Sequence, residues 1–519
     1  MIKNFFVFLF CLFFSSSSVF ASELPNNKFG IHLAVPNKDD LIAAAKLVNS
    51  NGGDWGYVTL VIQDNDLDQN KWQGIFDHLR ELHVIPLIRL ATHPENEGWA
   101  RPTVDQAEKW AIFLDSLNWV VKNRYVILFN EPNHATEWGG EVDPANYQAV
   151  AQAFITALKN KNPDFFVMLA AFDAAAPHQP PRYESEAVFL RAIRDLFPLI
   201  DGWASHSYQG EEYLKSPPNL PVFITETGFR HAEGIGYDRK LPTAAKTATL
   251  TVNLLQKLIR DPHVTAVTPF LLNYQAEPFD HFSWQKFNSS EFYPQYGAIQ
   301  DLAKVAGEPR QEQKLVVEPT LSHRLLADST YQIPIKIKNE GQAIWSKDEG
   351  YQVQLQFPDQ PEWEYFFTDF TNLKPFQSET LWLHLKTEGQ TDPATLKIAV
   401  AKNGETISNL VEWPVEVLPP INLELKVPRL FSRFTAPTGF KLVIYDSQEQ
   451  VVYVREKLTA VNGRIRVEGV NNLTLDQPYR LVMVKDGYLP RQTFLTPDAG
   501  DNSVVFKLML LDLQALLSL

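Results

Sequence analysis

Cysteine is almost absent from this 519-residue chain, which contains only Cys11. A chain with one thiol forms no internal disulfide and no cysteine-ligated metal centre. Basic residues are also under-represented, because 47 Lys and Arg stand against 61 Asp and Glu and leave a formal net charge of −14. Nucleic acids and anionic membranes bind clustered positive charge, so the composition argues against both as main partners.

Long hydrophobic runs are lacking as well. The apolar run from Phe5 to Phe14 follows Lys3 and precedes a serine tract and the small-residue site Val19-Phe20-Ala21. This order is typical of a signal peptide, predicted over residues 1–21. The run is too short to span a bilayer comfortably, so no transmembrane segment is expected in the mature chain. Export without disulfides favours a bacterial source and a secreted, periplasmic or cell-surface location.

From about residue 28 to 306, short apolar runs alternate with segments of helical period, which is the pattern of parallel βα units. Eight runs are predicted as strands: Phe29 to Leu33, Tyr57 to Ile62, Val84 to Leu90, Val126 to Phe129, Phe165 to Ala171, Gly202 to His206, Val222 to Thr225 and Ala266 to Leu272. Their number and spacing predict an α/β fold, a (β/α)₈ TIM barrel over residues 22–310. A doubly wound open sheet is the alternative, but no Gly-rich phosphate loop follows the first run.

After residue 310 the apolar residues alternate with polar ones, as in half-buried antiparallel strands. Two β-sandwich domains are predicted, over residues 311–419 and 420–519, with Pro419-Pro420 as a stiff boundary. The apolar end, Leu508 to Leu519, is predicted as a terminal strand or a docked tail.

Two glutamates end buried runs of the predicted barrel. Glu131 follows the fourth run in Asn130-Glu131-Pro132, and Glu226 follows the seventh in Thr225-Glu226-Thr227. In a barrel both carboxylates would lie at the carboxyl ends of the strands, where active sites form. Such a pair can serve as nucleophile and acid/base. A lone strand-terminal glutamate, by contrast, is more often a structural ion-pair partner.

These residues resemble the clan A glycoside hydrolases, retaining (β/α)₈ enzymes, over roughly residues 28–306. Asn130-Glu131-Pro132 looks like the clan's acid/base signature, with Asn130 bound to the sugar 2-hydroxyl, and Glu226 matches the nucleophile. His206 and Tyr208 match a His-x-Tyr pattern whose tyrosine steadies the nucleophile. The alternative for His206 and Tyr208 is ordinary core packing.

Several further residues are candidates for the site. The resemblance implies an arginine beside the nucleophile; Arg89 is the candidate, although many clan members carry it on strand two and a surface ion pair is the alternative. It also implies a tryptophan floor after strand eight, for which Trp284 is preferred over the nearer Tyr274. His32 is a further candidate, as are His93, Trp138 and Trp203, each with core or rim packing as the alternative.

The C-terminal region carries two weaker resemblances. The segment from Asn339 to Trp345 looks like a turn of immunoglobulin-like domains, and that from Lys485 to Pro490 looks like the carboxypeptidase-regulatory, prealbumin-like sandwich. Both imply spacer or stabilising modules, with carbohydrate binding as the alternative.

The sequence therefore predicts an exported retaining glycoside hydrolase acting on a β-linked carbohydrate substrate. No catalytic metal and no cofactor are expected, because no two histidines show the close helical spacing of a zinc-ligand motif. One alternative is a non-catalytic surface protein that binds glycans through the same barrel. Another is a barrel enzyme of a different reaction class, which would usually need a metal or a lysine at the strand ends.

Overall fold

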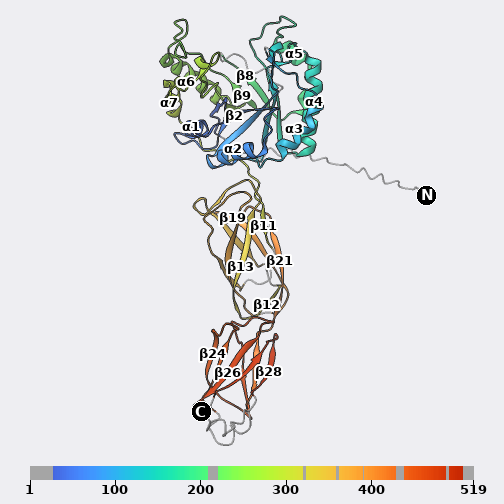
Figure 1. Cartoon of the computed structure of the whole chain (residues 1–519), viewed down its shortest axis with the longest axis vertical. Coiled ribbons are helices and arrows are strands. Elements are labelled where there is room, and N and C mark those ends of the chain that lie inside the picture. Colours follow the sequence, from blue (N-terminus) through green and yellow to red (C-terminus); the bar gives the residue numbers. More distant parts are fainter. Residues whose placement is uncertain are drawn as a thin grey trace, which may run out of the picture. The chain divides into compact units, whose positions relative to one another are not determined.

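A computed structural model describes residues 27–96, 98–208, 220–318, 323–357, 362–389, 391–427, 438–486 and 490–506. The predicted signal peptide with Cys11, the tail from Leu508 to Leu519, and Gly487 to Leu489 of the C-terminal motif lie outside these residues. The chain divides into two units, Met1–Gln311 and Glu312–Leu519. Figure 1 shows the helices and strands of the chain.

The described part of the first unit is built on eight parallel strands. They are β1 (Gly30–His32), β2 (Gly56–Gln63), β3 (Val84–Ala91), β6 (Arg124–Asn130), β7 (Phe165–Ala171), β8 (Trp203–His206), β9 (Val222–Glu226) and β10 (Val264–Val267). Their ladders run β1-β2-β3-β6-β7 and β10-β9-β8. Single parallel bridges join Met168 of β7 to Gly202 and Phe29 to Val267 of β10. The pairings therefore run around a complete ring.

Every predicted strand overlaps one of these eight. The seven residues of β7 coincide with the predicted run, because a continuous buried apolar segment has clear limits. The last prediction, Ala266 to Leu272, differs most, since β10 ends at Val267. Beyond it the backbone N–H of Thr268 still bonds to Ile224 O at 2.8 Å, and the chain then leaves the ladder.

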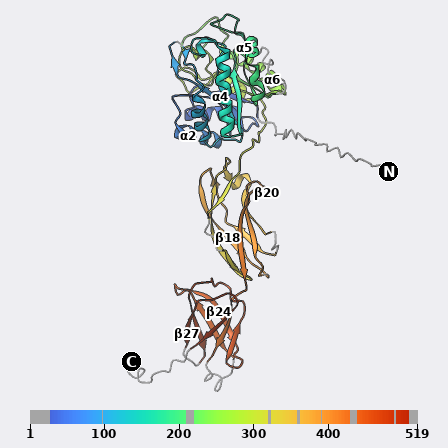
Figure 2. The ribbon, with the colours of Figure 1, turned by 90° about the vertical axis from the view of Figure 1, so that its right-hand side faces the viewer.

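Helices follow the strands and lie on the outside of the ring (Figures 1 and 2). They are α1 (Lys38–Val48), α2 (Gln69–Glu81), α3 (Gln106–Asp115), α4 (Pro144–Lys161), α5 (Glu186–Ala192), α6 (Ala244–Arg260) and α7 (Pro294–Gln300), with 3₁₀ turns η1 (Ala135–Glu137), η2 (Arg194–Leu199) and η3 (Asp280–Phe282) and a short hairpin, β4 (Pro94–Glu95) and β5 (Gly98–Trp99). Asp143 caps α4 by accepting from Asn146 N, ahead of a proline at the first turn. Within the described segments, no helix has the length and hydropathy needed to cross a bilayer.

Aromatic side chains fill the amino-terminal end of the ring. Tyr57, Tyr125, Phe166 and Phe223, each near the start of its strand, pack edge-on or tilted with centroids 5.0 to 6.4 Å apart. Aromatic pairs in this geometry add to the free energy gained from burial. This end is therefore closed by apolar packing, and the carboxyl ends of the strands are left for polar groups.

The second unit consists of antiparallel-rich sheets with two separate apolar cores. The first set is β11 (Leu315–Val317), β12 (Arg324–Leu326), β13 (Thr330–Asn339), β14 (Trp345–Ser346), β15 (Tyr351–Gln356), β16 (Glu364–Phe367), β17 (Asn372–Leu373), β18 (Ser378–Lys386), β19 (Ala394–Lys402), β20 (Glu405–Thr406) and β21 (Val411–Leu418), with the 3₁₀ turn η4 (Lys347–Glu349). The second set is β22 (Asn422–Lys426), β23 (Phe440–Tyr445), β24 (Val451–Leu458), β25 (Arg464–Val467), β26 (Tyr479–Lys485), β27 (Arg491–Leu495) and β28 (Asp501–Val505).

The residues picked out by the first C-terminal motif stabilise a turn. Asn339 is fully buried, and its amide donates to Ala343 O at 2.8 Å and Leu373 O at 2.9 Å and accepts from Gly341 N at 2.9 Å. Trp345 is buried two residues beyond Ala343. The motif therefore stabilises this turn of the second unit through buried packing and hydrogen bonds.

Candidate active site

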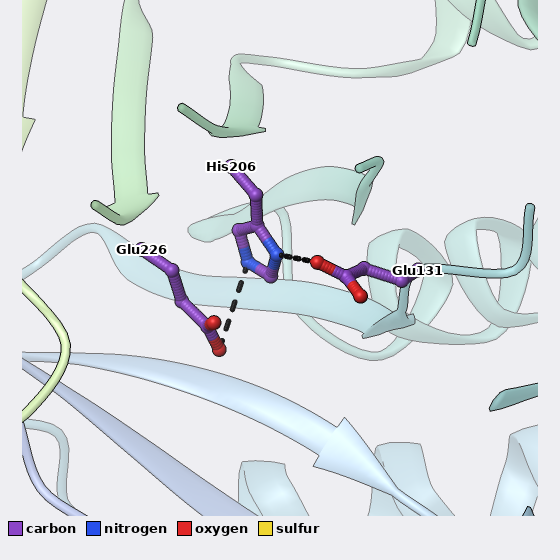
Figure 3. Close-up of side chains that lie close together, drawn as sticks. All are labelled: Glu131, His206 and Glu226. Carbon is purple, nitrogen blue, oxygen red and sulfur yellow. Dashed lines mark hydrogen bonds and ion pairs between the residues drawn. The ribbon is translucent and has the colours of Figure 1, made fainter. Parts of the chain in front are cut away.

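Polar side chains from the carboxyl ends of four strands line one cavity of about 590 Å³, and His206, at the end of a fifth strand, contacts two of the lining carboxylates without lining the cavity itself. His32 ends β1, Arg89 lies near the end of β3, Asn130 ends β6, His206 ends β8 and Glu226 ends β9. Glu131 follows Asn130 directly. Figure 3 shows Glu131 and Glu226 approaching His206 from opposite sides. The strand ends bring together residues that are as much as 194 positions apart in the sequence (32 to 226).

The two glutamates are close neighbours. One carboxylate oxygen of each, together with a ring nitrogen of His206, lies within 4.8 Å of the other two atoms. His206 Nδ1 is 2.6 Å from Glu131 Oε1, and His206 Nε2 is 3.8 Å from Glu226 Oε1. The imidazole therefore lies between the two carboxylates.

Glu226 is held as an anion. Arg89 Nη1 donates to its Oε1, the Tyr208 hydroxyl donates to its Oε2 at 2.5 Å, and His32 Nε2 lies 3.6 Å from Oε1. Burial alone would raise the pKa of this carboxyl, but His206 and Arg89 outweigh it and lower the pKa of Glu226 to about 2. A buried carboxylate that stays ionised is suited to act as a nucleophile.

The two histidines differ in protonation although both are almost fully buried. Burial lowers the pKa of His206, but the Glu226 and Glu131 carboxylates outweigh it and the pKa is raised overall. Burial dominates at His32 and lowers its pKa to about 3. The pKa values of the two histidines thus move in opposite directions, and His32 is a neutral ring at working pH.

The backbone around Glu131 adopts a rare conformation. Phe129 has φ of 73° and Glu131 has φ of 30°, both in the left-handed region that side-chain-bearing residues seldom occupy. The segment is held by Glu131 N, which donates to Ala171 O at 3.0 Å, and by His134 N, which donates to Glu131 O at 2.8 Å. Strain of this kind, fixed by its surroundings, is concentrated at functional sites.

Trp284 is not where the sequence placed it. Its side chain is only 3% exposed and packs in the core of the first unit, and it is not among the described residues that line the cavity. The loop after β10 turns back so that Trp284 N bonds to Leu271 O and Leu272 O, both at 3.1 Å, which leaves the indole in the core. The apolar wall is instead formed by Phe270, Tyr274, Phe279 and Phe282.

Of the remaining candidates Trp138, Trp203 and His93, the structure places only Trp138 among the described residues that line the cavity. Trp138 is fully buried and also lines the cavity. Trp203 is a core residue stacked on Phe172, with centroids 6.4 Å apart. His93 is half exposed and pairs with Asp64 at 3.1 Å.

Two acidic groups of the cavity lining were not predicted from the sequence. Glu137, in η1, accepts at 3.0 Å from Asn130 Nδ2. Asp173, just after β7, pairs with His134 at 2.9 Å. Asp173 follows the buried run of β7 by two residues, a strand-end position that was overlooked in the sequence, whereas Glu137 lies on a 3₁₀ turn that no strand-end pattern marks.

Glu131, His206 and Glu226 are also close enough together to act as metal ligands. Arg89, however, donates to the same Glu226 oxygen that approaches His206. A metal ion there would meet the positive guanidinium at close range, which is unfavourable in a buried site. The contacts fit a carboxylate pair better than a metal centre.

No protein-family model matches the chain, and no curated protein matches it in sequence. Several solved structures are similar. An endo-β-1,3-glucanase from Pseudomonas viridiflava is 15% identical, covers 53% of this chain and 97% of its own, and has a TM-score of 0.36. A β-mannanase from Thermomonospora fusca is 14% identical over 54% and 92% of the two chains, with a TM-score of 0.37. A β-glucuronidase from Parabacteroides merdae is 10% identical over 90% and 62%, with a TM-score of 0.36.

Proposed function

We propose that the chain is an exported retaining O-glycoside hydrolase that cleaves a β-linked oligo- or polysaccharide, with the first unit as a (β/α)₈ barrel. The observation that carries this proposal is the approach of Glu131 and Glu226 oxygens to within 4.8 Å of each other. Retaining glycosidases place their two carboxyl groups about 5 to 5.5 Å apart, and inverting enzymes about 6.5 to 9.5 Å apart.

Glu226 is the nucleophile of the first step. Its carboxylate attacks the anomeric carbon and forms a glycosyl ester, while Glu131 gives a proton to the departing oxygen and the glycosidic bond breaks. The low pKa of Glu226, about 2, supports the nucleophilic role. The 2.6 Å contact with His206 Nδ1 fixes the position of the Glu131 carboxyl.

In the second step Glu131 acts as the base. It takes a proton from water, whose oxygen attacks the anomeric carbon and releases Glu226. The two successive inversions at the anomeric carbon restore its starting configuration. Asn130 is a ligand for a sugar hydroxyl, His32 supports the site as a neutral ring, and the wall of Phe270, Tyr274 and Phe279 offers aromatic surface to sugar faces. The two sheet sets of the second unit serve as immunoglobulin-like and prealbumin-like spacer modules.

Product stereochemistry tests this proposal. The full chain is screened against β-glucans, β-mannans and other β-linked polysaccharides, and the first anomer released by wild type is followed by ¹H NMR. We expect the β-anomer first, with the α-anomer growing only at the rate of mutarotation. Saturable glycan binding without cleavage would favour the non-catalytic alternative instead.

A further inference from the structure

Glu137 is a cavity-lining carboxylate that the mechanism above does not use. Its Oε2 accepts from Asn130 Nδ2 at 3.0 Å, Asn130 Oδ1 accepts from Arg89 Nη1 at 2.8 Å, and the same Arg89 nitrogen donates to Glu226. We propose that Glu137 is a positioning residue that fixes the orientation of the Asn130 amide and, through it, holds Arg89 against Glu226. This inference rests on the proposed function.

The chemistry of the three side chains allows only one orientation of the amide. A carboxylate accepts hydrogen bonds and a guanidinium donates them, whereas an amide has one end of each kind. With the amide nitrogen toward Glu137 and the oxygen toward Arg89, both contacts are favourable. In the reversed amide, two donors would face each other at Arg89 and two acceptors at Glu137. Without the Glu137 acceptor, one of these two constraints on the amide disappears.

The backbone that carries Glu137 is well anchored. Glu137 N donates to His134 O at 3.1 Å, and the neighbouring Trp138 is fully buried with its ring nitrogen 3.1 Å from Asn146 Oδ1. Gly98 of β5 packs so closely on η1 that a Cβ there would overlap the Thr136 carbonyl oxygen. A side chain on such a rigid turn can define the position of its partner.

The same orientation prepares Asn130 for substrate. The amide nitrogen has two hydrogens; one is used by Glu137, which leaves the other for a sugar oxygen. Burial raises the pKa of Glu137 because it disfavours the charged form, and the hydrogen bond from Asn130 Nδ2 opposes this effect. The Glu137 carboxylate thus controls both the position of Arg89 and the Asn130 N–H that faces the substrate.

Two variants of Glu137 separate its hydrogen-bonding role from its volume. Glu137→Met keeps the length but removes the acceptor, and we expect kcat/KM to fall roughly 10- to 100-fold. Glu137→Gln keeps an acceptor oxygen and should stay within about fivefold of wild type. Glu141→Met is the matched control, because Glu141 is an exposed acidic residue of the same segment that, among the described residues, forms an ion pair only with Arg101, at 3.5 Å; its activity should equal that of wild type.

The pathway through Asn130 is tested in an Asn130→Ala background. There Glu137→Met should change kcat/KM by no more than about twofold, because its route of action is already lost. Glu137→Met alone should also move the acidic limb of the kcat/KM profile to higher pH, since a displaced Arg89 no longer lowers the pKa of Glu226. A purely structural role would lower activity equally at all pH values.

Full activity of Glu137→Met, or an undiminished loss in the Asn130→Ala background, would overturn the inference. An inactive wild type would instead contradict the proposed function. If wild type is inactive, crystal structures of wild type and Glu137→Met test the positioning role of Glu137. We expect a rotated Asn130 amide and a lengthened contact between Arg89 Nη1 and Glu226; an unchanged pair would overturn it.

Discussion

The two units of the chain treat buried charge in opposite ways. Among the described residues, the first unit buries seven charged side chains, namely Asp40, Arg80, Glu184, Glu186, Glu226, Asp280 and Lys304. The described part of the second unit buries polar groups such as Asn339, Gln342, Thr387 and Asn502, but no Asp, Glu, Lys or Arg. Its ion pairs involve exposed or half-exposed side chains, for example Arg324 with Glu416 at 3.6 Å.

The burial of charged side chains in the first unit lowers stability unless other contacts compensate for it. An ionised group loses its hydration on burial and must be compensated by partners. Asn339 and Thr387 need only backbone hydrogen bonds, which they make, and they stabilise turns. Glu226 needs Arg89, Tyr208 and His206 around it. The proposed mechanism uses this ionised carboxylate, so the proposal places the chemistry in the first unit.

Removal of the proposed acid, Glu131, should have the largest effect on activity among the substitutions considered below. Glu131→Ala should lower kcat by about 10²- to 10⁴-fold on substrates with poor leaving groups, because the leaving oxygen is no longer protonated. Aryl glycosides with very acidic leaving groups should be affected much less in the first step. Equal losses across a series of leaving groups would contradict the assignment.

Arg89→Met tests whether the guanidinium of Arg89 compensates for the burial of the Glu226 carboxylate. This change leaves a buried carboxylate without its guanidinium partner, and breaking such a pair costs about 3–5 kcal/mol of unfolding free energy. The pKa of Glu226 should rise from about 2, which moves the acidic limb of kcat/KM to higher pH. Denaturant unfolding and pH-rate profiles measure the two effects. Lys71→Met, which breaks an exposed ion pair with Asp66, is the control and should cost at most about 1 kcal/mol.

The stability effect of Arg89→Met should depend on pH. The folded pKa of Glu226 lies at about 2, below the ordinary value of 4.5, so its contribution is present above about pH 4.5 and is lost as the pH falls toward 2. The difference between wild type and Arg89→Met should therefore be large at pH 7 and shrink toward pH 2. A difference independent of pH would show that the guanidinium acts through packing alone.

The smallest effect is expected from Asn339→Ala in the second unit. The change leaves two backbone carbonyls and one N–H without their partner, at a cost of about 1–3 kcal/mol. Activity on a soluble substrate should not change, because the site lies within the first unit. Thermal unfolding and kcat/KM are measured together. A loss of turnover by the folded variant would contradict the division of roles between the units.

Most of the site's framework could be predicted from the sequence because it lies at strand ends. Asn130, Glu131, His206 and Glu226 each follow or end a continuous buried run, Arg89 lies near the end of one, and parallel strands bring such ends to one edge. Arg89 was predicted near the end of the third strand, with a contact to the nucleophile as one interpretation and a surface ion pair as the alternative; in the structure it donates to Glu226.

The loops could not be predicted in the same way. Trp284 was assigned to the cavity because the resemblance implies a tryptophan after the eighth strand, but the return of the loop past Leu271 and Leu272 decides where its side chain lies. Glu137 was missed because a 3₁₀ turn, with no periodic pattern of its own, carries it to Asn130. Loop paths depend on long-range contacts, which local residue patterns do not encode.

The most direct test of the central claim is turnover by Glu226→Ala in the presence of azide, with an activated aryl glycoside that wild type cleaves. The variant alone should be inactive. Azide should fill the space left by the carboxylate, restore cleavage, and give a glycosyl azide of inverted configuration, identified by NMR. Substantial activity without azide, or an azide product of retained configuration, would contradict the role of Glu226 as nucleophile.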